Sequence, residues 1–182
     1  MPTAAFSARL VLAMLLAAFG HVVIGGSPAA AQKPPSAEQQ ALAAAIDKSN
    51  AYIGLMNRTL RAVESWARYT SWVNLKSGPT GRERYIDYGL YGLYDVRDDI
   101  AKDRESMSRE PSAPDLDQTV ARYIEAYAAL APLLTSANGY YERKDWKSDS
   151  MAEGKALHAK MVPAASLFLT ERATLELQMK AF

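Results

Sequence analysis

Hydrophobic residues recur along most of the chain at alternating steps of four and three, which keeps them on one face of an α-helix. The first such pattern begins after Ser36 and extends to about Lys76, where Ser77-Gly78-Pro79 favours a helix end. Ser36 and Gln39 have the spacing of a capping box, which satisfies free backbone amides at a helix start. We expect the apolar stripe of this helix to face the core; it comprises Leu42, Ile46, Ser49, Ile53, Met56, Leu60, Val63, Ala67 and Thr70.

A second helix is predicted from about Arg82 to Met107, and the segment 110–114, which contains two prolines, separates it from the next. Gly89 and Gly92 weaken this prediction, because glycine costs about 1 kcal/mol relative to alanine inside a helix. The apolar side of this helix is expected at Ile86, Leu90, Leu93, Val96 or Arg97, and Ile100.

The third predicted helix begins after Asp115 and has the strictest spacing, although Pro132 lies inside it and predicts a kink. Ser148-Asp149-Ser150 offers an N-cap for a fourth helix that reaches Phe182, with a second kink predicted at Pro163. The expected buried positions are Leu116, Val120, Tyr123, Tyr127, Leu130, Leu134, Ala137 and Tyr141 in the third helix, and Leu157, Met161, Ala164 or Ala165, Phe168, Leu175, Met179 and Phe182 in the fourth.

No part of the chain alternates convincingly between apolar and polar residues with a period of two, which is the pattern of a β-strand. The sequence therefore predicts an all-α fold, an elongated antiparallel bundle of about four long helices joined by short connections.

Residues 1–31 have the parts of a secretory signal peptide: a basic start at Arg9, a short apolar run, and Ala29-Ala30-Ala31 at the end. The alternative, a membrane anchor, needs about 20 continuous apolar residues, and Gly20 and His21 interrupt the run. We predict cleavage after Ala31 and a periplasmic or secreted protein. Residues 32–35 are then an extended leader and residues 36–182 the bundle domain.

The composition is that of an ordinary globular protein, with 49% hydrophobic and 23% charged residues among 182. The chain has no cysteine, so a disulfide scaffold is excluded. Lys and Arg total 21 against 20 Asp and Glu, and this balance gives no electrostatic signature of nucleic-acid binding. We also predict no stable membrane span after residue 31.

Four tyrosines recur every three residues in the predicted second helix, where this spacing distributes the rings around half of the cylinder. One hypothesis is an aromatic wall that binds a small ligand. The other is a helix packed between neighbours, with the hydroxyls reaching water or backbone. The four are Tyr85, Tyr88, Tyr91 and Tyr94, and Tyr52, Trp66, Tyr69 and Trp72 are candidates for the same layer.

Two sets of acidic residues have helical spacing, and hard cations prefer such oxygen ligands. Interleaved basic residues favour a solvated, mixed-charge face for the first set, and helix capping by Asp149 is the better explanation for the second. We therefore predict no metal site. The sets are Asp95, Asp99 and Asp103, and Asp145, Asp149 and Glu153.

His158 is the only histidine after residue 31, too few for a di-iron bundle site or a paired-histidine metal site. Covalent haem attachment needs cysteine, no serine lies in a Gly-x-Ser-x-Gly turn, and no glycine-rich phosphate loop is present. We predict a protein that is not an enzyme and holds no cofactor. A hydrolase that uses His158 remains a further hypothesis.

Two segments carry a family resemblance. Residues 50–57 read Asn-Ala-Tyr-Ile-Gly-Leu-Met-Asn, and residues 140–158 contain a Tyr-Tyr pair, an acidic and aromatic turn, and then Asp, Gly-Lys and His. Together they resemble the YiiG-like family of bacterial envelope proteins, a domain family of unknown function, over about residues 47–170. The resemblance implies an exported, helical and often lipid-anchored protein. This chain lacks a lipidation cysteine and is expected to be shorter at its C-terminus than typical members.

The resemblance gives the second segment a structural interpretation, and the family supplies no catalytic residues. The Tyr140-Tyr141 pair and Trp146 would anchor a tight turn between the last two helices. Asp149 would cap the following helix, Gly154 would permit close helix approach, and His158 would lie one turn further along.

The first hypothesis is therefore an exported, non-enzymatic helical bundle with an interaction or structural role in the envelope. Its partner is predicted to be a second copy of the chain or another envelope protein. The alternative is a periplasmic bundle that binds an apolar or aromatic small ligand.

Overall fold

The computed structural model describes residues 34–182, and residues 35–182 form one unit. The predicted signal peptide and the first two residues of the predicted leader lie outside the described residues. The unit contains the long helices α1 (Ala37–Thr70), α3 (Pro114–Glu142) and α4 (Ala152–Ala181), and the shorter α2 (Arg97–Met107). Two 3-10 turns are also present, η1 (Ile86–Tyr88) and η2 (Asp145–Lys147).

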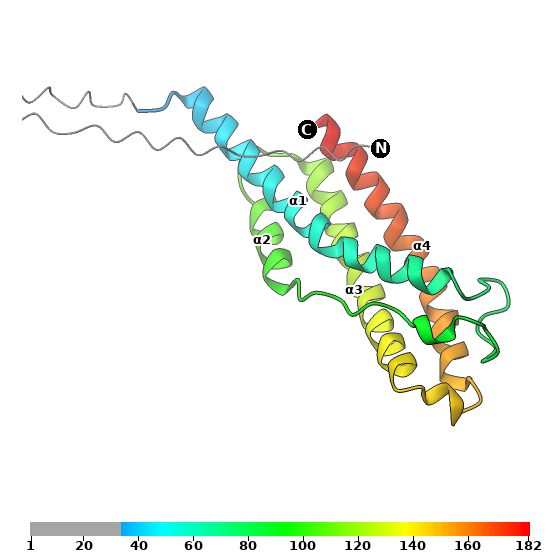
Figure 1. The fold of residues 1–182 in the computed structure, drawn as a ribbon. Coiled ribbons are helices and arrows are strands. Elements are labelled where there is room, and N and C mark those ends of the chain that lie inside the picture. The colour runs from blue at the N-terminus through cyan, green and yellow to red at the C-terminus, as the bar shows by residue number, and fades with distance from the viewer. Residues whose placement is uncertain (1–33) are drawn as a thin grey trace, which may run out of the picture. The chain divides into compact units, whose positions relative to one another are not determined.

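Successive helices run in opposite directions, and no strand occurs within residues 34–182 (Figure 1). The predicted all-α antiparallel bundle is thus confirmed. The prediction of about four long helices was wrong in one respect, because α2 has only 11 residues. None of the described helices is both long and apolar enough to cross a membrane.

The start of α1 follows the sequence prediction, whereas its end does not. The Ser36 hydroxyl accepts a hydrogen bond from the Gln39 amide at 3.2 Å, and the Ser36 amide donates to the Gln39 side chain at 2.8 Å. The helix ends at Thr70 and not near Lys76. The chain then turns before Gly78, whose φ of 70° suits glycine.

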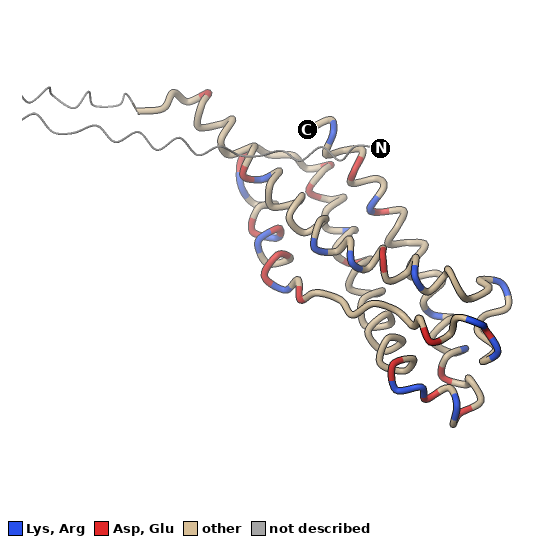
Figure 2. Tube along the Cα trace, viewed as in Figure 1, with Lys and Arg blue, Asp and Glu red and all other residues tan. Residues whose placement is uncertain are grey.

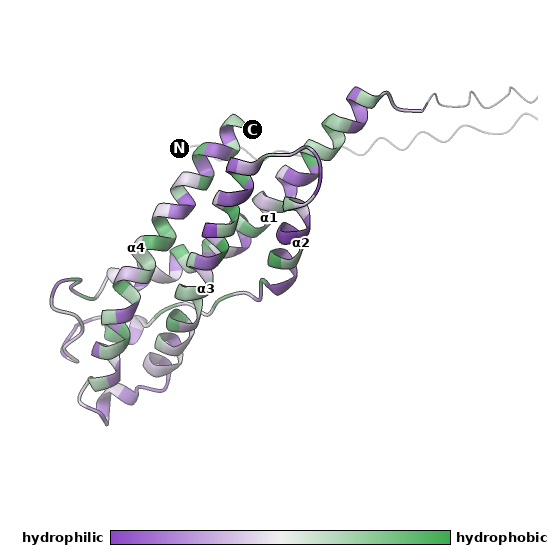
Figure 3. Ribbon diagram, turned by 180° about the vertical axis from the view of Figure 1, so that it is seen from behind, coloured by the Kyte–Doolittle hydropathy of each residue, from purple (hydrophilic) through white to green (hydrophobic). Residues whose placement is uncertain are grey.

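The apolar stripe predicted to face the core from α1 proved to be mostly solvent-exposed, which corrects that prediction. Its four largest aliphatic members near the amino terminus and middle of α1 are 42–61% exposed, namely Leu42, Ile46, Ile53 and Leu60. A different face is buried, formed by Tyr52, Leu55, Thr59, Ala62 and Tyr69. Tyrosine rings bury a large area and their hydroxyls find partners inside, so this face is the one that packs. The amino-terminal turns of α1 stand clear of the other helices and carry hydrophobic residues (Figure 3).

Helices α3 and α4 form an antiparallel hairpin whose facing sides supply most of the core. All eight predicted core positions of α3 are buried. In α4, Leu157, Met161, Ala165, Phe168 and Leu175 are buried, whereas Phe182 is 45% exposed. Pro132 and Pro163 both lie within helices that continue past them.

The largest error of sequence interpretation concerns residues 82–96, which we call the strap. They were predicted to be helical, but apart from η1 they have no regular structure and run back along α1 to reach α2 (Figure 1). Gly89 adopts a positive φ of 54°, which is uncommon for other residues and incompatible with a continuous α-helix.

Candidate functional site

The strap is held along α1 by hydrogen bonds from side chains of that helix and of Trp72, which follows it. Trp72 Nε1 donates to the Gly89 carbonyl at 2.9 Å. Ser65 Oγ donates to the Tyr91 carbonyl at 3.0 Å and accepts from the Tyr91 amide at 3.2 Å. Because these side chains satisfy its backbone groups, the strap does not need a helix or sheet to do so.

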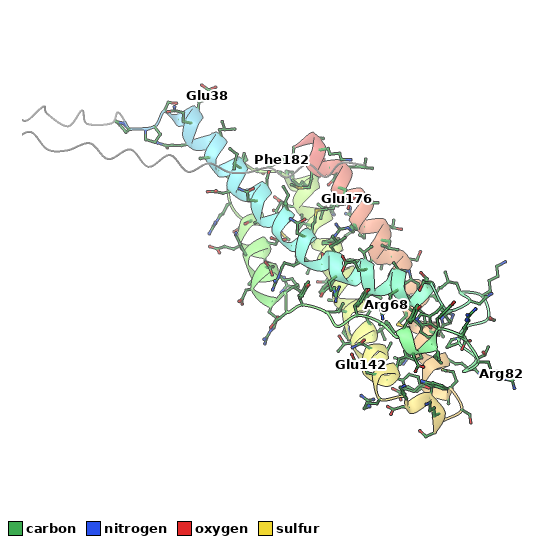
Figure 4. All side chains as sticks on the ribbon, in the orientation of Figure 1. Glu38, Arg68, Arg82, Glu142, Glu176 and Phe182 are labelled. Carbon is green, nitrogen blue, oxygen red and sulfur yellow. The ribbon has the colours of Figure 1, made fainter. Side chains whose placement is uncertain are left out.

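Three arginines of α1 extend this arrangement toward α2. Arg68 donates to the Tyr88 carbonyl at 2.6 Å, Arg61 to the Gly92 carbonyl at 3.3 Å and Arg58 to the Asp95 carbonyl at 3.1 Å. Figure 2 shows the basic residues along the carboxyl-terminal half of α1, and Figure 4 shows Arg68 beside the strap. Their spacing with Ser65 and Trp72 on one helical face is the sequence signal that could have revealed the strap.

The four tyrosines of the strap do not wrap around a helix. Tyr88, Tyr91 and Tyr94 lie over these arginines, whereas Tyr85 lies beside Arg84. The guanidinium of Arg61 is 4.1 Å from the centre of the Tyr91 ring, and that of Arg58 is 5.2 Å from the Tyr94 ring. Such cation–π contacts at exposed positions are each worth about 0.5–1 kcal/mol. Tyr85 and Tyr88 stack with ring centres 5.0 Å apart, and both are more than 40% exposed.

An open groove of ≈ 660 Å³ lies at the Tyr94 end of the strap. One wall comes from the strap and the start of α2, and the other from the middle of α3. The lining is mainly apolar and includes Leu93, Tyr94, Ile100, Tyr127, Ala131 and Pro132. Of the tyrosines singled out from the sequence, only Tyr94 reaches this groove, and sequence reasoning placed Tyr127 in the core without a binding role.

The predicted site residues around the junction of α3 and α4 come together in space. We call this group the junction cluster; it contains Tyr140, Tyr141, Asp149, Gly154 and His158. Tyr140 donates a hydrogen bond to Asp149 at 2.9 Å, and Asp149 accepts from the amides of Met151 at 2.8 Å and Glu153 at 2.9 Å. Asp149 thus binds free amides at the start of α4. These contacts, first that from the Glu153 amide, lower the pKa of the Asp149 carboxyl.

Gly154 lies against the aromatic pair of α3. A Cβ atom at this position would be 2.4 Å from the Met151 sulfur, 3.0 Å from Tyr140 and 3.1 Å from the Tyr141 hydroxyl. Glycine therefore allows the first turn of α4 to contact α3. Trp146 is only half-buried, with the Lys147 ammonium 5.2 Å from its ring centre.

His158 is 8% exposed and has partners on both ring nitrogens. Its Nε2 lies 3.2 Å from the Leu75 carbonyl, and its Nδ1 lies 2.9 Å from the Tyr69 hydroxyl. Because a carbonyl only accepts, Nε2 carries the proton and Nδ1 accepts from Tyr69. Gly78 packs on this ring, with its would-be Cβ 3.0 Å from His158 Cδ2.

Tyr69 and Trp72 belong to the junction cluster and not to a layer with the strap tyrosines, which corrects that expectation. The Tyr69 and Trp72 rings meet edge to face at 5.1 Å, and Trp72 meets Tyr141 in the same way at 5.0 Å. Burial is the main cause that raises the pKa of both the Tyr69 and Tyr141 hydroxyls. The rings of the cluster thus form a packed interior.

The three aspartates expected on one solvated face have different environments. Asp95 pairs with Arg97 at 2.6 Å, and Asp99 lies 3.6 Å from Arg58. Asp103 is instead 1% exposed, and neither of its carboxylate oxygens has a hydrogen-bond partner among the described residues. Burial first, and then the charge of Asp99, raises the pKa of Asp103 to about 7.

A buried ion pair lies near the amino-terminal end of α3. The Lys48 ammonium is 2.8 Å from Asp117 and also donates to the carbonyls of Arg109 at 3.2 Å and Pro111 at 3.1 Å. Tyr52 donates to the other oxygen of Asp117. Within residues 34–182, no group of three or more His, Cys, Asp and Glu side chains is arranged to hold a metal ion.

These features define an all-α bundle that has a buried aromatic cluster at the junction of α3 and α4 and a strap with exposed tyrosines. The chain belongs to the family described as "Protein of unknown function (DUF3829)", whose model matches residues 43–177. It is 32% identical over 116 residues to the uncharacterized protein YiiG of Escherichia coli (strain K12), which confirms the resemblance to the YiiG-like family. That match covers 62% of this chain and 33% of the relative, so the chain spans about a third of the relative's length. No solved structure matches.

Proposed function

We propose that the protein is an exported, non-enzymatic interaction protein of the bacterial envelope, and that it docks through the exposed apolar stripe of α1. The observation that carries this proposal is the exposure of Leu42, Ile46, Ile53 and Leu60 on a helix whose opposite face is buried from Lys48 onward. We call this stripe the α1 seam. Contiguous apolar surface on a small domain marks an interaction site.

The spacing of the α1 seam favours a helical partner. Ile46, Ile53 and Leu60 recur every seven residues and Leu42 lies one turn before Ile46, whereas Met56 of the same heptad pattern is buried in the core. A sustained heptad pattern with isoleucine at such positions favours two-stranded packing. On its solvent side the seam is flanked by the uncharged residues Ala43, Asn50 and Asn57. Two copies can therefore meet without like-charge repulsion, and we assign a second copy of the chain as the partner.

Sedimentation equilibrium of the purified protein over a wide concentration range tests this assignment. We expect a dimer for the natural sequence and a monomer for the double variant Ile46→Glu/Ile53→Glu, because two buried charges would oppose the seam. Leu177→Glu, at a 68% exposed position of α4, is the matched control and should leave the dimer intact. A monomer at every concentration of the natural protein would contradict the proposal.

Export is supported by the predicted signal peptide and by the absence of charge between Arg9 and Lys33. The full chain expressed in a bacterium should be recovered from the periplasm or medium with Gln32 at its amino terminus, as determined by mass spectrometry. The double variant Ala29→Lys/Ala31→Lys should accumulate as the uncut precursor. Uncut natural chain in the cytoplasm would overturn this part of the proposal.

A non-catalytic role is supported by the environment of His158. Both of its nitrogens are occupied by Tyr69 and Leu75, and neither of these partners is a nucleophile activated for hydrolysis. If His158 were catalytic, His158→Gln would abolish a hydrolytic activity of the natural protein. We expect a panel of ester, amide and phosphate substrates to show no such activity to lose.

The alternative hypothesis, a bundle that binds a small apolar or aromatic ligand, is favoured by a different observation. The groove between the strap and α3 has a volume of ≈ 660 Å³, within the range of about 300–1,000 Å³ typical of small-molecule sites. The two roles use different surfaces and are compatible.

A further inference from the structure

One polar group in the groove between the strap and α3 has no partner. Tyr127 lines the groove and is 6% exposed, yet its hydroxyl makes no hydrogen bond with any other residue of the described part of the chain. The other buried tyrosines differ: Tyr52, Tyr69, Tyr123 and Tyr140 all use their hydroxyls in hydrogen bonds. The Tyr127 hydroxyl is not one of the fully buried polar atoms that lack a partner, so it remains accessible from the groove.

Pro132 provides a second polar group beside Tyr127. Because proline has no backbone N–H, the carbonyl four residues earlier, that of Ala128, loses its intrahelical donor. Both Ala128 and Pro132 line the groove. The groove therefore contains one hydroxyl and one carbonyl that are available to a bound molecule, within otherwise apolar walls.

The charges at the rim of the groove neutralise each other. Asp95 and Arg97 both line it, and the Arg97 guanidinium donates to the Asp95 carboxylate at 2.6 Å. Because these two charges are paired with each other, neither is left to pair with an ionic ligand. The groove therefore favours a neutral ligand.

The wall formed by the strap is preorganised. Arg58 donates to the Asp95 carbonyl at 3.1 Å and also lies 5.2 Å from the Tyr94 ring centre. The Tyr94 ring is thereby held at the groove without any contribution from a ligand. Preorganisation of this kind lowers the entropic cost of binding.

We propose that this groove binds a neutral aromatic molecule that carries a hydroxyl group, with Tyr127 and the Ala128 carbonyl as its hydrogen-bond partners. A hydroxyl both donates and accepts, so it matches this pair of groups. The ring system would pack against Leu93, Ile100 and Ala131. This assignment rests on the small-ligand hypothesis and is independent of the α1 seam.

Equilibrium dialysis with 2-naphthol and with naphthalene, which has the same ring system without the hydroxyl, tests the assignment. We expect the natural protein to bind 2-naphthol more tightly than naphthalene. Tyr127→Phe should weaken 2-naphthol binding by about 5- to 10-fold, the effect of one hydrogen bond, and leave naphthalene binding unchanged. Tyr85→Phe, outside the groove, should change neither.

A second variant tests the position of the site. Thr135→Trp places a large ring at an exposed lining position and should weaken both probes by more than 10-fold. Its matched control is Thr170→Trp on α4, because both threonines are exposed and both bond the carbonyl four residues earlier at 2.9 Å. Far-ultraviolet circular dichroism confirms that each variant is folded.

The outcomes are distinguishable. Binding of 2-naphthol that is unaffected by Thr135→Trp would overturn the groove assignment and leave a small-ligand role elsewhere on the protein. Equal loss of both probes on Tyr127→Phe would overturn the role of the hydroxyl. No binding of either probe to the natural protein would overturn the assignment together with the small-ligand hypothesis, while the dimer measurement would still decide the role of the α1 seam.

Discussion

Two tyrosine-rich segments of this protein have opposite structural roles. In the junction cluster, Tyr140 and Tyr141 lie on α3 with 0% and 3% exposure, and Tyr141 packs against the rings of Tyr69 and Trp72. In the strap, Tyr85, Tyr88 and Tyr94 are 42–51% exposed and lie on a segment without regular structure. Both segments carry tyrosines, so residue type does not explain the difference in burial. The difference follows from how each segment satisfies the hydrogen bonds of its backbone.

The two segments differ in where the hydrogen bonds of their backbones are formed. The junction cluster lies on helices whose backbones are satisfied internally, so its side chains are free to form the core. The strap relies on Trp72 and on four side chains of α1 for hydrogen bonds to its backbone carbonyls, those of Arg58, Arg61, Ser65 and Arg68. Its rings cover those same side chains and remain partly in solvent.

The sharpest test of this contrast is a pair of tyrosine truncations. Tyr141→Ala should reduce the free energy of unfolding by about 4 kcal/mol, because it leaves a cavity among Tyr69, Trp72 and Tyr140. Tyr94→Ala should reduce it by about 1 kcal/mol or less, since only exposed cation–π contacts are lost. Urea unfolding followed by circular dichroism measures both. Equal losses would contradict the expected difference between the buried Tyr141 and the exposed Tyr94.

The second prediction concerns the pH dependence of stability that arises from Asp103 on α2, the helix that follows the strap. Because the pKa of Asp103 is raised to about 7 in the folded protein, the folded state binds more protons than the unfolded state between about pH 4 and pH 7. The free energy of unfolding should therefore fall across this range as pH rises, by about 3 kcal/mol in total.

Asp103→Asn cannot ionise and should remove this part of the pH dependence. Urea unfolding at several pH values should show the variant gaining stability relative to the natural protein as pH rises. Three ionisable groups interact electrostatically with Asp103, and the variant retains all of them. They are Tyr52 on α1, and Asp99 and Lys102 on α2. Parallel pH profiles for the two proteins would contradict the prediction.

A smaller difference is expected between two glycines. Gly154→Ala should cost about 2 kcal/mol, because its Cβ would overlap the Met151 sulfur, which is itself enclosed by Tyr140 and Tyr141. Gly92→Ala should change stability by less than about 0.5 kcal/mol, since no atom lies within 4 Å of the added Cβ. Thermal unfolding of both variants checks this, and an equally destabilised strap variant would contradict it.

Much of the fold was predictable from local patterns, and the candidate groove was not. The capping box at Ser36 and the α3 stripe from Leu116 to Tyr141 appear as expected, because both depend on residues within a few positions of each other. The groove joins Tyr94 with Tyr127 and Pro132, which lie on segments separated by α2. The periodicity of Tyr127 indicated burial, but no local signal showed that its hydroxyl would be open to the groove, without a hydrogen bond to another described residue.

The sequence by itself determined the helices α1, α3 and α4 and the all-α class, because caps and apolar periodicity act within one or two turns. Tertiary structure decided which face of α1 is buried, since both of its faces carry hydrophobic residues and only contacts with α2, α3 and α4 choose between them. It also decided the strap, whose carbonyls bind side chains 17 to 37 positions away along the chain. Interactions over such separations depend on the whole fold and leave no periodic pattern in the local sequence.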